Sequence, residues 1–317
     1  MTNAAVSVVV PVYNSAGTLG ELADRLRSTM SQLGREHELV FVNDGSSDSS
    51  WGRIVELAAA QESVRGLDLM RNSGQHNALL AGIRAARYDV VVTLDDDLQN
   101  PPEEIPKLLA KLEEGFDVVY GSADERQFGL WRNAGTALTK LALRWVIGDA
   151  VAGKVSAFRA FRADLRDAFA DFDAPYVSID VLLSWGTTSF SWVMVEHHPR
   201  AEGHSSYTFG RLATHALNVM TGFSTRPLRI ASLIGLVFTL FGIAVLAVVL
   251  VTYVVEGGSV PGFPFLASVV AIFAGAQLLT LGIIGEYLAR MHMRVMDRPP
   301  FTIRAETGRG SRARAGY

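Results

Sequence analysis

The chain has 317 residues and a formal net charge of −3, so it can hold one large domain and a further segment, and its charge does not favour a nucleic-acid partner. It contains no cysteine, which excludes disulfide bonds, thiolate metal sites and a cysteine nucleophile. The lack of cysteine is consistent with a reducing compartment.

Apolar runs and helical patterns alternate along the first part of the chain. The runs predict strands at residues 6–10, 39–42, 67–70, 90–94 and 118–121, with strand-like segments again at 156–162 and 192–196. Strands that alternate with helices are typical of an α/β fold with a mostly parallel, doubly wound sheet. Polar turns follow the first four runs. Because the carboxyl ends of parallel strands share one edge, we expect these turns to converge on one crevice.

The most distinctive stretch is residues 90–104, where a β-branched run ends in Asp95, Asp96 and Asp97. Three adjacent carboxylates repel one another unless a cation or water offsets them. Strand alternation would point Asp95 and Asp97 one way and Asp96 the other. Asp95 and Asp97, together with the carbonyl of Gln99, form a set of oxygen ligands suited to Mg²⁺ or Mn²⁺. This set predicts that a metal ion holds a pyrophosphate here. The alternative is a solvated acidic turn.

The sequence lacks the usual glycine-rich phosphate loops. No Gly-x-Gly-x-x-Gly follows the first strand and no Walker-type Gly-Lys-Ser/Thr occurs, so side chains and a metal would have to hold a nucleotide. Tyr13 could stack on a base, and Asp44 could accept hydrogen bonds from the base or ribose. Asn14 and Asp48 also fit ordinary turn and cap positions, and His76 fits an exposed residue at a helix start better than a catalytic one.

Residues 122–145 interleave basic and large apolar side chains. This pattern is typical of a segment that binds a phosphate on an apolar tail at a membrane surface. We assign that role to Arg126 and Arg132, which flank a glycine-containing loop. Lys140 and Arg144 fit solvated helix charges equally well.

Three histidines, His197, His198 and His204, lie near one another in a later loop. They lack the spacing and the partner ligands of a zinc site, so we do not predict zinc. Arg200, with Gly203 and Ser205 in the same loop, predicts contact with a phosphate instead.

Two uncharged runs, residues 230–255 and 257–285, each exceed the ~20 apolar residues that cross a bilayer as a helix. Glycine and proline separate them, which predicts a transmembrane hairpin with spans at about 230–255 and 264–286. Basic residues flank the outer ends, whereas the intervening loop has Glu256 and no Lys or Arg, so both termini are predicted to be cytoplasmic. The alternative is a buried core hairpin.

The predicted boundaries follow from these features. Residues 1–206 form a cytoplasmic domain, 207–229 a juxtamembrane segment, 230–288 the hairpin and 289–317 a cytoplasmic segment with a disordered tail. Apolar spacing over residues 212–223 predicts an amphipathic helix, either at the bilayer surface or packed on the soluble domain. Residues 1–5 show no cleaved signal.

Six stretches are specific in combination: residues 9–14 (Val-Val-Pro-Val-Tyr-Asn), 43–46 (Asn-Asp-Gly-Ser), 74–78 (Gly-Gln-His-Asn-Ala), 94–103 (Leu-Asp-Asp-Asp-Leu-Gln-Asn-Pro-Pro-Glu), 223–229 (Phe-Ser-Thr-Arg-Pro-Leu-Arg) and 285–287 (Gly-Glu-Tyr). Over about residues 5–305 the chain thereby resembles the membrane-anchored polyprenyl-phosphate glycosyltransferases of glycosyltransferase family 2. Within them it is similar to the undecaprenyl-phosphate aminoarabinose and glucosyl transferases. The resemblance implies a GT-A type, mostly parallel sheet with flanking helices, followed by amphipathic juxtamembrane helices and the two-helix hairpin.

The resemblance also implies roles for particular residues. Asp95, Asp97 and Gln99 would bind the divalent metal, Pro11, Tyr13 and Asp44 the nucleotide, and Arg126, Arg132 and Arg200 the lipid phosphate, with Thr136 at a hydroxyl position of that site. We add Asn14, Gln75, Asp96 and Ser205 to the substrate-binding set, and we take Asp97 and the three arginines as catalytic. The chain departs from the family at residues 203–207, Gly-His-Ser-Ser-Tyr, where relatives commonly have a lysine, and at residues 153–156, which lack a Ser-Gly-Phe type sequence.

The implied reaction is transfer of one sugar from a nucleoside-diphosphate sugar, with a UDP-sugar favoured, to undecaprenyl or decaprenyl phosphate at the inner membrane face, with inversion. A processive polysaccharide synthase is the enzymatic alternative, but residues 141–145 lack the glutamine of a Gln-x-x-Arg-Trp motif. A membrane-tethered nucleotide-sugar sensor is the non-enzymatic alternative. Glycines in the spans would permit the close helix contacts of a dimer or tetramer.

Overall fold

The computed structural model describes residues 4–122, 153–174, 177–198, 224–256, 262–296 and 298–308. The chain divides into two compact units, Met1–Ala216 together with Asp297–Tyr317, and Leu217–Met296. The first unit therefore includes a segment from the far end of the sequence.

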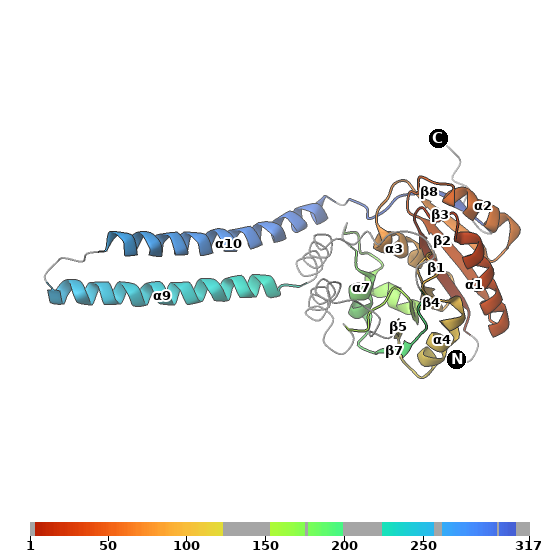
Figure 1. The fold of residues 1–317 in the computed structure, drawn as a ribbon, viewed down its shortest axis with the longest axis horizontal. Coiled ribbons are helices and arrows are strands. Elements are labelled where there is room, and N and C mark those ends of the chain that lie inside the picture. Colours follow the sequence, from red (N-terminus) through yellow and green to blue (C-terminus); the bar gives the residue numbers. More distant parts are fainter. Residues whose placement is uncertain are drawn as a thin grey trace. The chain divides into compact units, whose positions relative to one another are not determined.

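The first unit is built on a mixed, mostly parallel sheet (Figure 1). Its described strands are β1 (Val6–Val12), β2 (His37–Asn43), β3 (Val64–Leu69), β4 (Val90–Thr93), β5 (Val118–Ser122), β6 (Arg159–Arg162), β7 (Phe190–Met194) and β8 (Ile303–Thr307). Their order is β7-β5-β6-β4-β1-β2-β3-β8. Strands β1 to β4 pair in parallel, as do β5 and β7, whereas β6 and β8 are antiparallel to their neighbours. The predicted α/β class and mostly parallel sheet are confirmed.

Helices cover both faces of this sheet. The described ones are α1 (Leu19–Leu33), α2 (Ser50–Ala60), α3 (Gln75–Ala85), the 3-10 turn η1 (Pro102–Glu104), α4 (Ile105–Glu113), the 3-10 segment η3 (Ala163–Phe169) and α7 (Ile179–Gly186). Successive strand side chains alternate between faces, and Val8 and Val10 of β1 share one buried cluster with α1, α2 and α4. Val9 faces the other way and meets α3, where a Cβ on Gly82 would collide with it. The small residue lets α3 lie directly on the sheet.

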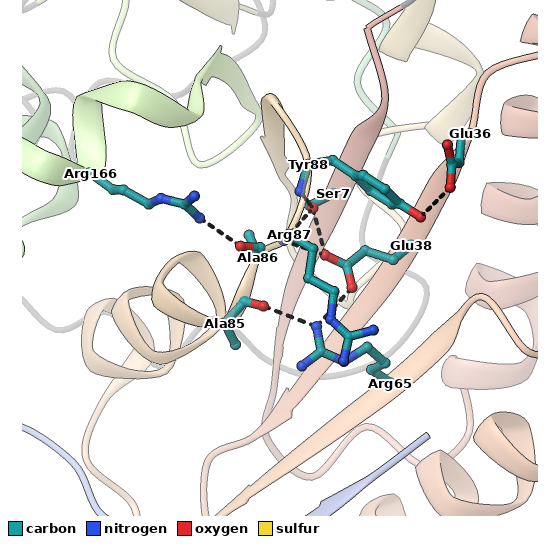
Figure 2. A network of polar contacts seen from close by, with 9 residues as sticks. All are labelled: Ser7, Glu36, Glu38, Arg65, Ala85, Ala86, Arg87, Tyr88 and Arg166. Atoms are coloured by element: carbon teal, nitrogen blue, oxygen red, sulfur yellow. Dashed lines mark hydrogen bonds and ion pairs between the residues drawn. The ribbon is translucent and has the colours of Figure 1, made fainter. Parts of the chain in front are cut away.

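At the amino end of the strands lies a buried polar network (Figure 2). Arg65 of β3 and Glu38 of β2 form an ion pair of 2.8 Å, and their side chains are only 9% and 5% exposed. Glu38 also accepts hydrogen bonds from the Ser7 hydroxyl and the Arg87 N–H, both at 2.7 Å. Buried charges are costly unless they are paired and hydrogen-bonded, as these are. The network joins three strands to the turn that leads into β4.

A second buried group joins β5, β6 and α7. Asp180 at the start of α7 pairs with Arg159 of β6 and accepts a 3.0 Å hydrogen bond from the Tyr120 hydroxyl of β5. The Arg159 guanidinium also lies 5.9 Å from the centre of the Tyr120 ring. Burial, together with the negative charge of Asp180, raises the pKa of Tyr120 well above its usual value, so Tyr120 stays a hydrogen-bond donor.

The second unit contains two long helices, α9 (Arg226–Glu256) and α10 (Phe263–Val295). Both are long and apolar enough to cross a membrane, and the most apolar window of each contains no buried residue. Phe238 and Phe241 of α9 contact Phe273 of α10 by ring packing. Helices at both predicted spans are confirmed, whereas their insertion in a bilayer stays a prediction, as do the predicted domain boundaries.

Candidate functional site

The carboxyl ends of four parallel strands surround one pocket of about 290 Å³. It is lined by Pro11, Val12, Tyr13, Asp44, Asn72, Gly74, Gln75, Asp95, Asp96 and Asp97. These residues come from the ends of β1 and β2, the connection between β3 and α3, and the loop after β4. The convergence expected from the polar turns is confirmed.

Asp44 ties two of these turns together. Its carboxylate accepts backbone hydrogen bonds from Ser73 at 2.7 Å and from Gly74 at 2.9 Å. Burial raises the pKa of Asp44 above its usual value, and the two backbone hydrogen bonds offset part of that effect. The residue lines the pocket as a buried acceptor, which suits a base or ribose donor.

Asp96 has a structural as well as a lining role. Its Oδ2 atom accepts the Tyr13 N–H at 3.2 Å, and its carbonyl oxygen accepts the Thr18 hydroxyl at 2.8 Å. Burial raises the pKa of Asp96, although hydrogen bonds from Ser15 and the Tyr13 N–H act in the opposite direction. Asp96 therefore anchors the loop that presents Tyr13.

The geometry of the Asp-rich loop differs from the expectation in one respect. Strand β4 ends at Thr93, so the alternation of a strand does not set the directions of the three carboxylates. All three line the pocket. Leu98 follows them with a φ of 60°, a left-handed conformation that is rare for a bulky residue. The left-handed turn at Leu98, and not the alternation of side chains along a strand, therefore sets the course of the loop.

Asp95 and Asp97 are each oriented by an amide. The Gln75 Nε2 atom donates to Oδ1 of Asp95 at 2.6 Å, and the Gln99 N–H donates to Oδ1 of Asp97 at 3.1 Å. No group of three or more His, Asp or Glu side chains within the described ranges is arranged as a metal site. Mg²⁺, however, usually takes one or two protein carboxylates and completes its shell with water and phosphate oxygens. Two carboxylates at one pocket fit that requirement.

The structure brings together most of the predicted site residues that it describes. Pro11, Tyr13, Asp44, Gln75, Asp95, Asp96 and Asp97 line the pocket. Gln99 and Asn14 are not among the lining residues: the Gln99 backbone carbonyl accepts the His198 N–H at 2.8 Å, and Asn14 Oδ1 accepts the Ser47 N–H at 2.8 Å. Arg126, Arg132, Thr136, Arg200 and Ser205 lie outside the described residues. The individual roles stay predictions.

Sequence reasoning missed Val12, Asn72 and Gly74 as lining residues. Asn72 and Gly74 belong to the polar turn after the third predicted strand, so the rule that placed Asp44 could have placed them too. Gly74 has a φ of 93°, a conformation that glycine adopts without strain. His76 is half-buried and not exposed as predicted, and its Nδ1 atom accepts the Ile179 N–H at 3.4 Å. His197 Nδ1 lies 3.4 Å from Asn100 Oδ1, and His204 lies outside the described residues.

A mostly parallel sheet with an aspartate-lined pocket at its carboxyl edge is an α/β fold whose pocket lies where such folds bind their ligands. The pattern for "Glycosyl transferase family 2" matches residues 7–167, which is half of the chain. The chain belongs to glycosyl transferase family 2 and is a nucleotide-sugar glycosyltransferase.

Solved structures support the fold. Glucosyl-3-phosphoglycerate synthase from Mycobacterium tuberculosis, determined with Mn²⁺, UDP and glucosyl-3-phosphoglycerate, is 21% identical, with a TM-score of 0.52 over 69% of this chain and 78% of that one. Mannosyl-3-phosphoglycerate synthase from Rubrobacter xylanophilus is 15% identical, with a TM-score of 0.50 over 71% of this chain and 74% of that one. At these identities the likeness concerns the fold alone.

Proposed function

We propose that this glycosyltransferase moves one sugar from a nucleoside-diphosphate sugar to polyprenyl phosphate at the cytoplasmic face of a membrane, with inversion at the anomeric carbon. The observation that carries the proposal is the presence, in one chain, of the aspartate-lined pocket and of two long helices whose apolar side chains are exposed. A UDP-sugar is the favoured donor.

The donor half of the proposal rests on the pocket. Tyr13 is 51% exposed at the pocket, where it can stack on a base, and Asp44 supplies a buried acceptor. Asp95 and Asp97 would hold Mg²⁺ or Mn²⁺, which would act as a Lewis acid on the departing diphosphate. The glucosyl-3-phosphoglycerate synthase above was determined with Mn²⁺ and UDP, and we extend that donor chemistry to this chain.

The acceptor half rests on α9 and α10. A helix in the core of a soluble protein is mostly buried, whereas large apolar side chains along both helices are more than half exposed, among them Leu233, Leu240, Val270 and Leu281. Apolar surface on this scale marks a membrane or protein contact. An acceptor on a polyprenyl tail would be confined to the bilayer that these helices are proposed to cross.

Little general-base chemistry is needed in this reaction. The second pKa of a phosphate monoester is about 6, so the attacking oxygen is already anionic near neutral pH. The remaining tasks are to align the two substrates and to neutralise charge. We assign the binding of the acceptor phosphate to Arg126, Arg132 and Arg200, on the strength of the sequence resemblance.

The test offers purified full-length protein radiolabelled UDP- and GDP-sugars, with Mn²⁺ and either undecaprenyl phosphate or 3-phosphoglycerate. The proposal predicts label in the lipid fraction as a single-sugar product. Label on phosphoglycerate alone would overturn the acceptor class, and long polymer would favour a processive synthase. Metal-dependent donor binding without any turnover would favour a non-enzymatic sensor.

A further inference from the structure

Three residues lie side by side across the carboxyl edge of the sheet. Val12 of β1 pairs with Asn43 of β2, and Asn43 pairs with Asp68 of β3. The Asn43 side chain donates a 2.7 Å hydrogen bond to Oδ1 of Asp68. Asp68 is only 3% exposed, so its carboxylate is a buried charge beside the pocket that no step of the reaction uses.

This row of residues supports two turns of the pocket that contact each other: the first turn follows β2, and the second turn connects β3 to α3. Asn43 Oδ1 accepts the Ser46 N–H at 3.4 Å, and Asp44 accepts two N–H groups of the other turn. Gly45, with a φ of 65°, lies so close to that turn that a Cβ would come 2.5 Å from the Asn72 nitrogen. A shift in one turn must therefore move the other.

Strand β8, which follows α10 in the sequence, contacts the residues at which the second turn begins. Strand β8 pairs with β3, with a register shift between Asp68 and Leu69, and Arg304 lies at that shift. Such irregularities redirect side chains next to functional sites. Arg304 Nη2 donates to the Met70 carbonyl at 2.8 Å, and Nη1 lies 3.5 Å from Oδ2 of Asp68.

We propose that Arg304 is a positioning residue of the nucleotide pocket, acting through Asp68 and Met70. The segment after the proposed membrane hairpin thereby completes the donor site. Nucleotide affinity then depends on a strand that lies more than two hundred residues along the chain from the turns it supports. The inference rests on the proposed function only in that the pocket binds a nucleoside diphosphate.

The experiment measures the Kd of UDP and GDP, with Mn²⁺, for full-length protein in detergent. Arg304 is 58% exposed, so we expect Arg304→Ala to weaken binding of the preferred nucleotide about threefold to tenfold. The donor KM should rise similarly, with kcat and the acceptor KM unchanged. Arg304→Lys should restore only part of the affinity, because an ammonium cannot contact the Met70 carbonyl and the Asp68 carboxylate in the way that the guanidinium does.

Two further variants separate positioning from general effects. Arg298→Ala removes the same charge from an exposed position of the same segment and should bind nucleotide like the wild type. Asp68→Asn keeps an acceptor for Asn43 but loses the ion pair. Its combination with Arg304→Ala should cost less affinity than the sum of the single changes.

Three results would overturn the inference: unchanged nucleotide affinity in Arg304→Ala, equal weakening in Arg298→Ala, or full additivity with Asp68→Asn. If the first of these came with a lower Tm, Arg304 would have a purely structural role. Failure of the wild type to bind either nucleotide is a different outcome, because that would contradict the proposed function itself.

Discussion

The side-chain amide of Gln75 lies 2.6 Å from Oδ1 of Asp95 and joins the first residue of α3 to the Asp-rich loop after β4. Residues that orient metal ligands through hydrogen bonds typically change metal affinity or activity by about 10- to 100-fold when they are removed. Gln75 therefore sets the direction of a proposed ligand from a neighbouring element.

We expect Gln75→Ala to raise the Mn²⁺ concentration for half-maximal transfer by about tenfold or more, because Asp95 loses its orienting donor. A metal titration of activity at saturating donor measures the shift. Gln32→Ala, at an exposed position of α1, is the matched control and should titrate like the wild type. An unchanged Mn²⁺ requirement in Gln75→Ala would separate this residue from the metal.

Removal of a proposed metal ligand should have a larger effect. Asp97→Ala should lower kcat by about 100-fold or more, since the metal supplies several kcal/mol of charge stabilisation in such reactions. Chelation by EDTA should do the same to the wild type, and added Mn²⁺ should reverse it. Asp24→Ala changes a carboxylate that is 64% exposed and should stay active. Full activity of the chelated enzyme would exclude the metal-held diphosphate.

Asp44 predicts a pH dependence of nucleoside binding. Burial raises the pKa of Asp44, so the carboxylate that we propose accepts from the base or ribose is lost at a higher pH than for an exposed aspartate. Affinity should fall as pH decreases through this raised pKa. Protein stability should depend on pH in the opposite direction, because the folded state binds the Asp44 proton more tightly than the unfolded state does. The contribution of Asp44 to the free energy of unfolding is complete below its unfolded pKa of about 3.9 and is lost as pH rises through the folded pKa.

Binding of uridine and guanosine without metal, followed by NMR between pH 7 and 4, isolates this dependence because neither ligand carries a phosphate. The fall in affinity should be absent in Asp44→Asn, whose affinity is low throughout. Nucleoside binding by the wild type that stays equally strong at low pH would show that the carboxylate does not contact the nucleoside.

The sequence was informative where chemistry follows directly from a strand end. Asp44, Tyr13 and the Asp-rich loop could be placed together because parallel strands bring their carboxyl ends to one edge. The partner of Asp96 could not be predicted, because its contact to the Tyr13 N–H joins residues that are 83 positions apart. Strand β8 was missed for the same reason: residues 303–307 are short, and only pairing with the distant β3 makes them a strand.

The buried pair of Arg65 and Glu38 predicts a stability effect at the end of the sheet away from the pocket. Arg65→Met leaves Glu38 as an unpaired buried charge, which typically costs about 3–5 kcal/mol and should lower the Tm by roughly 6 °C or more. Arg53→Met breaks a pair whose side chains are 45% and 67% exposed and should change the Tm by at most about 3 °C. Equal shifts in scanning fluorimetry would contradict the argument from burial.

The absence of cysteine allows a direct test of the proposed hairpin, because any single introduced cysteine is the sole thiol. Val255, at the end of α9, and Met296, after α10, are 78% and 50% exposed. The proposed topology, in which basic residues lie outside the hairpin and none lies in its loop, predicts that the two positions are on opposite sides of the membrane. An impermeant maleimide added to inverted vesicles should therefore label Met296→Cys and not Val255→Cys, and right-side-out vesicles should give the reverse. Glu56→Cys, in helix α2 of the first unit, should be labelled from the same side as Met296→Cys. Labelling of Val255→Cys and Met296→Cys from the same side would show that the two helices do not cross the bilayer, and the lipid acceptor would lose its structural support.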